Sequence, residues 1–228
     1  MAFLKPLPIL NFTGTWVMEK ALSNGIESLM KLQCLNWAIR RAFRHIRIIS
    51  TITEYASTAA DGSPLALHLD VVHTVTGGFT GTTEKRTLDW SPYVHHDYVF
   101  GPCSLRSRLI GGIEDRDGHV RPALDMETTD VNGKVYEFLR GAVSSKGERE
   151  EGFVVEKTPQ EYIGSTRGGW LHTVSRSEEL GWTMEQVWGF EMIRGDRYHT
   201  RRIVVINKSG DYALARVVYK YHSETQQI

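Results

Sequence analysis

Residues 182–193 read Trp-Thr-Met-Glu-Gln-Val-Trp-Gly-Phe-Glu-Met-Ile, and their alternation decides the fold. Every second residue is large and mostly apolar, while the positions between them carry other side chains, two of them acidic. Because successive side chains of a strand point to opposite faces, this period of two predicts a strand with one face toward an interior. The residues on that face are Trp182, Met184, Gln186, Trp188, Phe190 and Met192.

Two further strands follow, at residues 197–207 and 212–222. A two-residue turn at Gly195-Asp196 would pair Met192 with His199, and a four-residue loop at 208–211 would pair Ile203 with Arg216. Directly opposed residues share a face of the sheet, so this register turns three polar side chains inward, together with Leu214. They are His199, Arg201 and Arg216. A slip of one residue is the alternative, and it would send the arginines to solvent.

Inward arginines have a physical consequence for the interior. A charge in a dry core costs several kcal/mol unless it is paired or hydrated, and neither arginine has a sequence-local partner. We therefore expect a wet or ligand-filled cavity lined by aromatic side chains, which is the composition of a small-molecule site. Trp90 and Tyr98 are further aromatic residues that we assign to substrate binding.

The rest of the chain predicts more strands around one helical insertion. Strands are expected at 11–18, 45–57, 65–76, 79–90, 96–110, 122–129 and 134–144, with a hairpin turn at Asn132-Gly133. Apolar residues recur at helical spacing between about residues 23 and 44, with a break near 33–36. This pattern predicts an all-β antiparallel barrel or sandwich, as a single domain over residues 1–228, with a short helical lid near the N-terminus.

The charge composition and the N-terminal residues limit the kinds of partner that the protein is expected to bind. Lysine plus arginine and aspartate plus glutamate both number 27, so a basic footprint for nucleic acid is absent. The arginine cluster at 40–47 predicts the wet face of a helix rather than a phosphate or membrane patch. Residues 1–10 are too short to span a bilayer and lack a cleavage signal, which favours a cytoplasmic protein without membrane association.

Metal and cofactor signals are weak. Cys34 and Cys103 make neither a disulfide framework nor a closed metal site, and we expect both to be reduced packing residues. His95 and His96 would point to opposite faces of a strand, as would His68 and His73, so neither pair easily binds one metal. The sequence lacks the motifs of phosphate-binding loops, dinucleotide-binding folds and nucleophile elbows. We therefore predict no metal and no cofactor. An inward histidine could still serve as an axial ligand of haem, so that alternative stays open.

The first strand, Phe12-Thr13-Gly14-Thr15-Trp16, resembles the signature of the calycins, the group of lipocalins and fatty-acid-binding proteins. In that group the glycine lets the strand bend and the tryptophan closes the barrel base. Residues 26–41 are similar to the helix-turn-helix lid of the fatty-acid-binding proteins, and Arg201 and Arg216 match their two interior arginines. The resemblance implies a lipocalin-like β-barrel. The family's late Arg-x-Tyr pair is not reproduced, because Tyr219 would point away in the register above.

Three longer stretches, at residues 77–84, 86–90 and 181–190, look similar to fungal lipocalin-like proteins of secondary metabolism. That set includes hetero-Diels–Alderases that join a tropolone-derived o-quinone methide to a humulene-type sesquiterpene. The resemblance implies a cofactor-independent pericyclase that binds small apolar substrates. Arg201 or His199 would hydrogen-bond the quinone-methide carbonyl and help expel water from an alcohol precursor, with Arg216 as a third catalytic donor.

Two other functions fit the same predicted pocket. A non-catalytic carrier of a fatty acid or terpenoid needs the aromatic walls but no rate effect. Another cyclase or isomerase of fungal secondary metabolism would use the same barrel for different chemistry. A homodimer is compatible with each of the three.

Overall fold

The computed structural model describes residues 10–58, 64–77, 79–81, 83–129, 133–157 and 167–222. Within these ranges its strands are β1 Gly14–Met18, β2 Ile48–Thr58, β3 Pro64–Val75, β4 Phe79–Thr80, β5 Glu84–Thr87, β6 Tyr93–Asp97, β7 Gly101–Glu114, β8 Val120–Pro122, β9 Arg167–Ser177, β10 Trp182–Ile193, β11 Asp196–Asn207 and β12 Tyr212–His222. Its helices are α1 Ile26–Leu32, α2 Trp37–Phe43 and α3 Lys134–Leu139.

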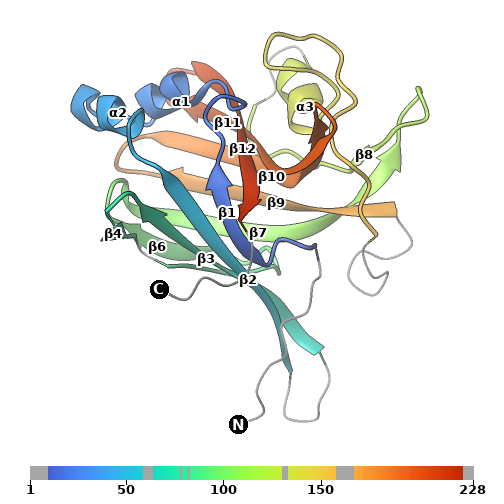
Figure 1. The fold of residues 1–228 in the computed structure, drawn as a ribbon, viewed down its shortest axis with the longest axis horizontal. Helices are drawn as coiled ribbons and strands as arrows, with labels where there is room; N and C mark the ends of the chain where they lie inside the picture. Colours follow the sequence, from blue (N-terminus) through green and yellow to red (C-terminus); the bar gives the residue numbers. More distant parts are fainter. Residues whose placement is uncertain are drawn as a thin grey trace.

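The strands form one antiparallel sheet that curls into a half-barrel (Figure 1). Its order is β4-β3-β2-β1-β12-β11-β10-β9-β7-β6, with β5 paired to β3 and β8 paired to β7. Helices α1 and α2 follow β1 and lie at one end of the curl, and Leu29 of α1 joins the inner core. The predicted all-β antiparallel fold with an early helical lid is therefore confirmed, and Asn36 caps α2 at the predicted break.

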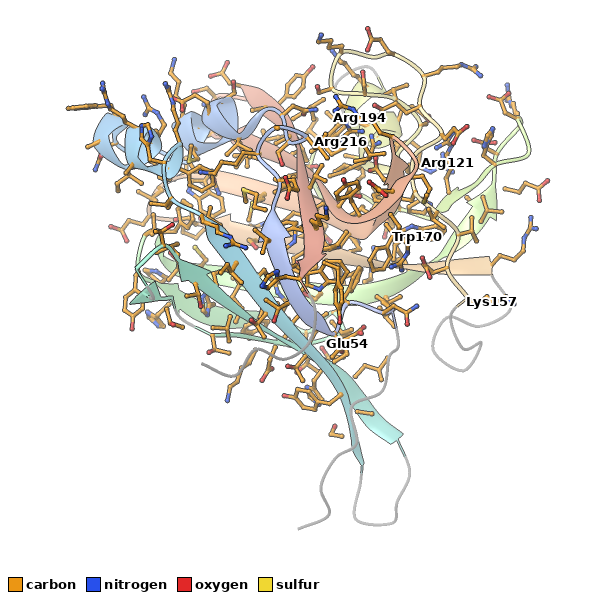
Figure 2. All side chains as sticks on the ribbon, viewed as in Figure 1. Glu54, Arg121, Lys157, Trp170, Arg194 and Arg216 are labelled. Atoms are coloured by element: carbon orange, nitrogen blue, oxygen red, sulfur yellow. The ribbon has the colours of Figure 1, made fainter. Side chains whose placement is uncertain are left out.

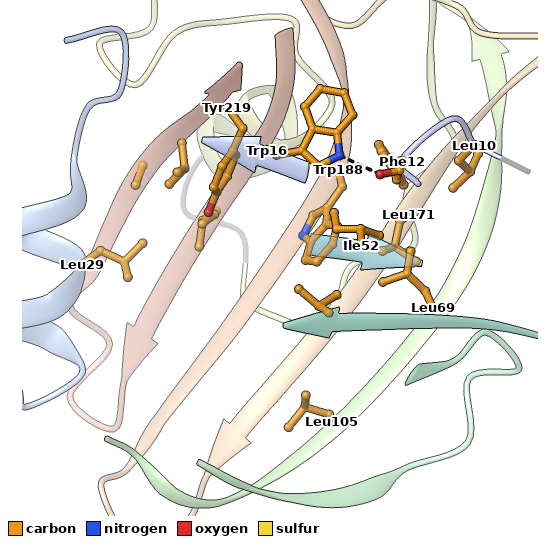
Figure 3. Close-up of a cluster of buried hydrophobic side chains, with 14 of the residues drawn as sticks. Leu10, Phe12, Trp16, Leu29, Ile52, Leu69, Leu105, Leu171, Trp188 and Tyr219 are labelled. Atoms are coloured by element: carbon orange, nitrogen blue, oxygen red, sulfur yellow. Dashed lines mark hydrogen bonds between the residues drawn. The ribbon is translucent and has the colours of Figure 1, made fainter. Parts of the chain in front are cut away.

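Aromatic side chains fill the base of the curl. Phe12 packs on Phe190 with ring centroids 5.2 Å apart, and Trp16 packs on the same phenylalanine at 5.8 Å. The Trp16 indole N–H donates to the Phe12 carbonyl at 2.7 Å (Figure 3). A buried tryptophan needs one partner for its single donor, and here the segment before β1 supplies it.

Glu54 holds that segment in place. Glu54 lies on β2 and is 2% exposed, and its carboxylate accepts backbone N–H bonds from Leu10, Phe12 and Thr13 and a hydroxyl bond from Thr13 (Figure 2). The N–H distances lie between 2.9 and 3.1 Å. Burial raises the pKa of Glu54, and the four donors oppose that shift.

A second core lies on the outer face of β9 to β12. Helix α3 packs there with Val135, Phe138 and Leu139, against Trp170 and Val204. Residues 134–144 were expected to form a strand, and this expectation is wrong, since residues 134–139 are helical and bury their apolar side against the sheet. The predicted turn residue Asn132 lies outside the described residues. The predicted strand at 122–129 is also wrong, because β8 ends at Pro122.

The turns of the last three strands differ from the predicted ones. Arg194-Gly195 forms the first turn, with φ angles of 56° and 89°, so Met192 pairs with Arg197 and Trp188 pairs with Arg201. This register moves by two residues, which keeps every side chain on its predicted face. The second loop is one residue shorter than predicted, since Asn207 bonds back to Asp211, and a one-residue change reverses β12.

Helix α2 has no buried residue. Trp37 on it is 68% exposed, and Arg40 and Arg44 pair with Glu27 of α1. The arginine cluster thus lies on an exposed helix face, as predicted. No helix among the described residues has the length and apolarity needed to cross a membrane.

Gly25, just before α1, allows the lid to approach β12. Its φ is +75°, and a Cβ there would lie 2.0 Å from the Leu214 carbonyl oxygen. We expect Gly25→Ala to destabilise the protein by about 3 kcal/mol, because strain and a backbone collision add. Gly118→Ala is the matched control, with a φ of +81° and open space, and it should cost about 1 kcal/mol. Urea unfolding of both variants checks this, and equal losses would refute the role of the close approach.

Candidate functional site

The concave face carries a polar layer above the aromatic base. Its members come from strands far apart in the sequence, and register places them on one face. They are Ser50, His73, Glu84, Arg86, Ser107, Thr173, Arg201 and Tyr219. Apolar residues of the lid and of neighbouring strand ends lie beyond them, including Leu29, Leu32 and Trp182. The polar layer is therefore enclosed between two apolar ones.

Arg201 is the cation at the centre of this layer. It is 6% exposed, and its Nε donates to His199 Nε2 at 3.2 Å while Nη2 donates to Ser50 Oγ at 3.3 Å. Among the described residues no carboxylate oxygen lies within 4 Å of its guanidinium. Burial lowers the pKa of Arg201. Its neighbour Arg202 points outward and pairs with Glu191 and Glu150, so the missing partner is particular to the inward arginine.

Arg86 forms the other cationic group. Its guanidinium binds Glu84 Oε2 at 2.5 and 3.2 Å and donates to Ser107 Oγ and Thr173 Oγ1 at 3.0 and 2.7 Å. Burial would raise the pKa of Glu84, but Arg86 and His73 outweigh it and hold the pKa at about 2. This pair is neutral as a unit, which leaves the charge of Arg201 without a paired carboxylate.

Trp188 presents its ring to both guanidiniums. The Arg201 carbon Cζ is 3.6 Å from the ring centroid, and the Arg86 Cζ is 5.5 Å from it. The indole N–H donates to Gln186 at 3.0 Å, so the ring is fixed in its plane. A π face attracts a cation most strongly when both are desolvated, and Trp188 is fully buried.

His199 holds the side chain of Arg201 in position through a hydrogen bond. It is 0% exposed and surrounded by rings, including Tyr219 at 5.4 Å and Phe12 at 4.8 Å. Its Nε2 accepts from Arg201, so its Nδ1 carries the proton and donates to the Gly189 carbonyl at 3.2 Å. Burial, followed by Arg201, lowers the pKa of His199 well below its usual value. A neutral ring with both nitrogens engaged orients the arginine and has no free atom for a substrate.

Five of the predicted substrate-binding residues face the interior, namely Trp182, Met184, Gln186, Trp188 and Phe190. Three do not contribute to it. Met192 lies beyond the base and is 52% exposed, Tyr98 is 83% exposed, and Trp90 packs on the outer face against Arg108 and His172. Trp90 follows a bend after β5, and its φ of 67° breaks the alternation on which its assignment depended.

Arg216 was predicted to be an inward catalytic residue, and this prediction is wrong. The shorter loop pairs it with Arg202 instead of Ile203, which places it on the outer face with Leu214. There it binds Glu191 and Glu150 at 3.2 and 3.3 Å. The same reversal turns Tyr219 inward, contrary to prediction, and the Arg201 Cζ lies 4.7 Å from its ring.

Sequence reasoning missed His73, Glu84 and Arg86. His73 has the same parity as Leu67, Leu69 and Val71, so the alternation of β3 already placed it on the apolar face. Glu84 and Arg86 are in phase with Leu88 within the strand expected at 79–90. The alternation was the usable signal, but only that of the last three strands was used to assign inward polar residues.

Two histidines of the inner face predict a pH dependence of stability. Burial lowers the pKa of His73 to about 4 and holds that of His199 well below its usual value, so both stay neutral while an unfolded chain takes up protons near pH 6.5. Stability is thus fully present above pH 6.5 and is lost as the pH falls toward 4. Urea unfolding should give a lower midpoint at pH 5 than at pH 7, and His73→Phe should reduce the difference. Equal midpoints at both pH values would contradict this.

The lid borders an open groove at the rim of the curl. A hollow of about 760 Å³ lies between α1 and the turns that precede β10 and β12, and its lining includes Lys31, Leu32, Cys34 and Lys208. Cys34 is exposed here, contrary to the packing role predicted for it, while Cys103 is buried and both are free thiols. The groove leads from solvent toward Leu32 and Leu180, which pack on the inner core.

Comparison with known proteins gives two kinds of match, and no family model matches the chain. Solved structures that match the chain include a Schistosoma mansoni fatty-acid-binding protein in complex with arachidonic acid, with 10% identity over 95% of this chain and 100% of that one, and a TM-score of 0.47. The REP1-NXSQ fatty acid transporter gives 9% identity over 94% and 98% of the chains and a TM-score of 0.46.

Curated proteins give longer sequence matches. "Pericyclase pydY" from Acremonium sp. is 24% identical over 211 residues, which cover 92% of this chain and 91% of that protein. "Probable pericyclase scpY" from Mollisia scopiformis is 25% identical over 206 residues, covering 90% and 87%. The chain is similar, along about nine-tenths of its length, to fungal proteins named as pericyclases.

Proposed function

We propose that this protein is a pericyclase that accelerates a hetero-Diels–Alder reaction between a tropolone-derived o-quinone methide and a humulene-type sesquiterpene. The observation that carries the proposal is Arg201, a buried inward guanidinium without a carboxylate partner, set against the face of Trp188. The match to named pericyclases supports the reaction class. The substrates follow from the sequence resemblance.

The proposed mechanism needs neither a nucleophile nor a metal from the protein. The concave face holds the two apolar reactants in contact, which removes most of the entropic cost of their encounter. Arg201 donates to the carbonyl oxygen of the quinone methide, where negative charge grows as the ring forms. Because His199 and Ser50 already hold Arg201 in position, little free energy is lost in reorienting it during the reaction. Its hydrogen bond to the substrate oxygen is therefore strongest in the transition state.

The surroundings of Arg201 increase its effect. The aromatic base and the apolar lid border the polar layer, and electrostatic interactions are stronger at low dielectric. Trp188 and Phe190 present flat walls, which would limit the face from which the alkene adds. Tyr219 delimits the same space beside Arg201.

The direct test is a cycloaddition in which the quinone methide is generated photochemically in the presence of humulenol. The protein should raise the rate and yield one enantiomer in excess. Arg149→Ala, on an 85% exposed side chain of the outer loop, serves as the control variant and should behave like the parent protein. A racemic product at the uncatalysed rate would refute the proposal.

A carrier function is the second candidate, and the lid groove next to the inner core is the observation that favours it. A carrier would bind fatty acids and terpenoids alike and change no reaction rate. Calorimetric titration with arachidonic acid and with humulene separates the two, because a pericyclase should prefer the reacting partners and a carrier should bind both classes.

A further inference from the structure

The residues that follow helix α1 lie along the start of β10. The Cys34 thiol donates to the Leu180 carbonyl oxygen at 3.8 Å, and the Gln33 amide nitrogen Nε2 donates to the Met184 sulfur at 3.7 Å. Trp182 comes between these two contact points in the chain, and its side chain belongs to the inner core. The lid therefore places Gln33 beside Trp182 at the rim of the concave face.

Gln33 is a buried amide without a strong acceptor. It caps the C-terminus of α1 and is 2% exposed, yet within the described ranges its Nε2 donates to nothing but a thioether sulfur. An amide nitrogen carries two N–H groups, and the sulfur of methionine is a weak acceptor. Buried polar groups of native proteins are nearly always well paired, so this amide has unused donor capacity.

Trp182 adds a second unused donor at the same place. It is 3% exposed and packs edge-on against Phe100, and its indole N–H has no acceptor among the described residues. An indole N–H can only donate, so only an oxygen or another acceptor would satisfy it. Trp170 of the outer core also lacks an acceptor, so one such atom does not make a site. Trp182 differs because a second donor lies beside it.

Accessible space reaches these two donors. Met184 faces the interior and contacts Gln33, yet it is half-buried rather than buried. Leu32 and Leu180 are also half-buried, and both line the groove of about 760 Å³ while they pack on the inner core. A single layer of side chains therefore separates the groove from the row of the inner face that holds the donors.

The polar side chains of this row carry no charge. On β9, Ser175 pairs with Met184 and Ser177 pairs with Trp182, so two hydroxyl groups stand beside the two donors. A buried carboxylate needs a cation or several strong donors to offset its lost hydration, and this row offers no cation. A neutral oxygen, as in an alcohol, an ether or a ketone, fits such donors better.

The row lies well away from the buried guanidinium. Trp188 pairs with Arg201, and Met184 comes four residues earlier on the same strand. A strand rises about 3.3 Å per residue, so the two positions are roughly 13 Å apart along β10. An oxygen bound beside Met184 is thus remote from an oxygen bound by Arg201.

We propose that Gln33 and Trp182 are specificity-determining residues, which bind a neutral oxygen of the alkene reactant at the lid end of the interior. The proposal rests on the pericyclase function proposed above and deepens it. It defines the second substrate as an apolar alkene that carries an uncharged oxygen remote from its reacting double bond. Leu32 and Leu180 turn aside as this reactant enters from the groove.

Binding of an alcohol and its parent hydrocarbon tests the subsite without any reaction. Calorimetric titration gives the Kd of humulene and that of humulenol, and their ratio measures the preference for the oxygen. Gln33→Met and Trp182→Phe should each lower this ratio about three- to tenfold, with humulene binding unchanged. Trp170→Phe removes an unpaired indole N–H of the outer core, and Met184→Leu alters the Gln33 contact without removing a donor, so both controls should keep the ratio.

Kinetics with photochemically supplied quinone methide complete the test. Because the contact is remote from the reacting carbons, both variants should raise KM for humulenol three- to tenfold and change kcat less than twofold. An unchanged Kd ratio in both variants would overturn the proposal, and so would an equal loss of affinity for both ligands, which indicates a structural role. A parent protein that keeps the ratio but accelerates no cycloaddition would instead remove the pericyclase function and leave the subsite standing.

Discussion

Arg201→Met should lower the rate of cycloaddition by a factor of about one hundred to one thousand. Methionine keeps much of the side-chain volume over Trp188 but removes every donor aimed at the substrate oxygen. Because that bond is strongest in the transition state, kcat should fall and KM should change little. Steady-state kinetics with photochemically supplied quinone methide measures both constants.

Two further variants make this result specific. Arg201→Lys keeps the charge and should retain an intermediate rate, because a lysine cannot bond His199 and Ser50 in the geometry of a guanidinium. Arg216→Met removes an arginine of the outer face and should cost stability rather than rate. If Arg216→Met lowered kcat as much as Arg201→Met did, the assignment of the inner face would be wrong.

Glu54→Ala should destabilise the protein by about 3–5 kcal/mol. The change leaves the buried N–H groups of Leu10, Phe12 and Thr13 without an acceptor, and each such group costs about 1–3 kcal/mol. It also releases the segment that seats Phe12 beneath Trp188 and Phe190. Urea unfolding followed by tryptophan fluorescence measures the loss.

Glu54→Gln is the matched variant for that prediction. Its amide oxygen can still accept some of these bonds, and it removes the charge that burial disfavours, so its loss should be at most half that of Glu54→Ala. Glu148→Ala, in an exposed turn, should be nearly neutral. A loss below about 1 kcal/mol for Glu54→Ala would show that the base of the curl is held by its aromatic contacts alone.

The alternation of β10 correctly predicted which of its side chains face inward. A register error of two residues leaves each side chain on the same face, so the misplaced turn did no harm. The first turn was misplaced by one residue on each strand, and Trp188, Phe190, His199 and Arg201 nevertheless kept their faces. The helical lid followed from apolar residues at helical spacing, with a break near residues 33–36 where the structure begins α2. These features are local, so the chain itself specifies them.

What could not be predicted depends on contacts between distant segments. Arg216 changed face because its loop is one residue shorter than a pattern of polar residues suggests. The segment 134–139 could be a strand or a helix by composition, and the apolar outer face of β9 to β12 decides for the helix. Glu84 and Arg86 of β5 meet His73 of β3, a strand separated from β5 by β4 in the chain, so only the folded sheet reveals their cluster.

The layer that α3 adds behind β10 to β12 gives the barrel one thick wall and one thin wall. Arg201 stands on the thick wall, where Arg202 anchors the α3 segment through the Phe138 and Val143 carbonyls. His73 and Glu84 stand on the thin one, built from β3 and β5. Amide hydrogens of β11 should therefore exchange last and those of β5 early. We expect a larger or smaller substrate to be accommodated by movement of β3 and β5, while the guanidinium of Arg201 stays in place.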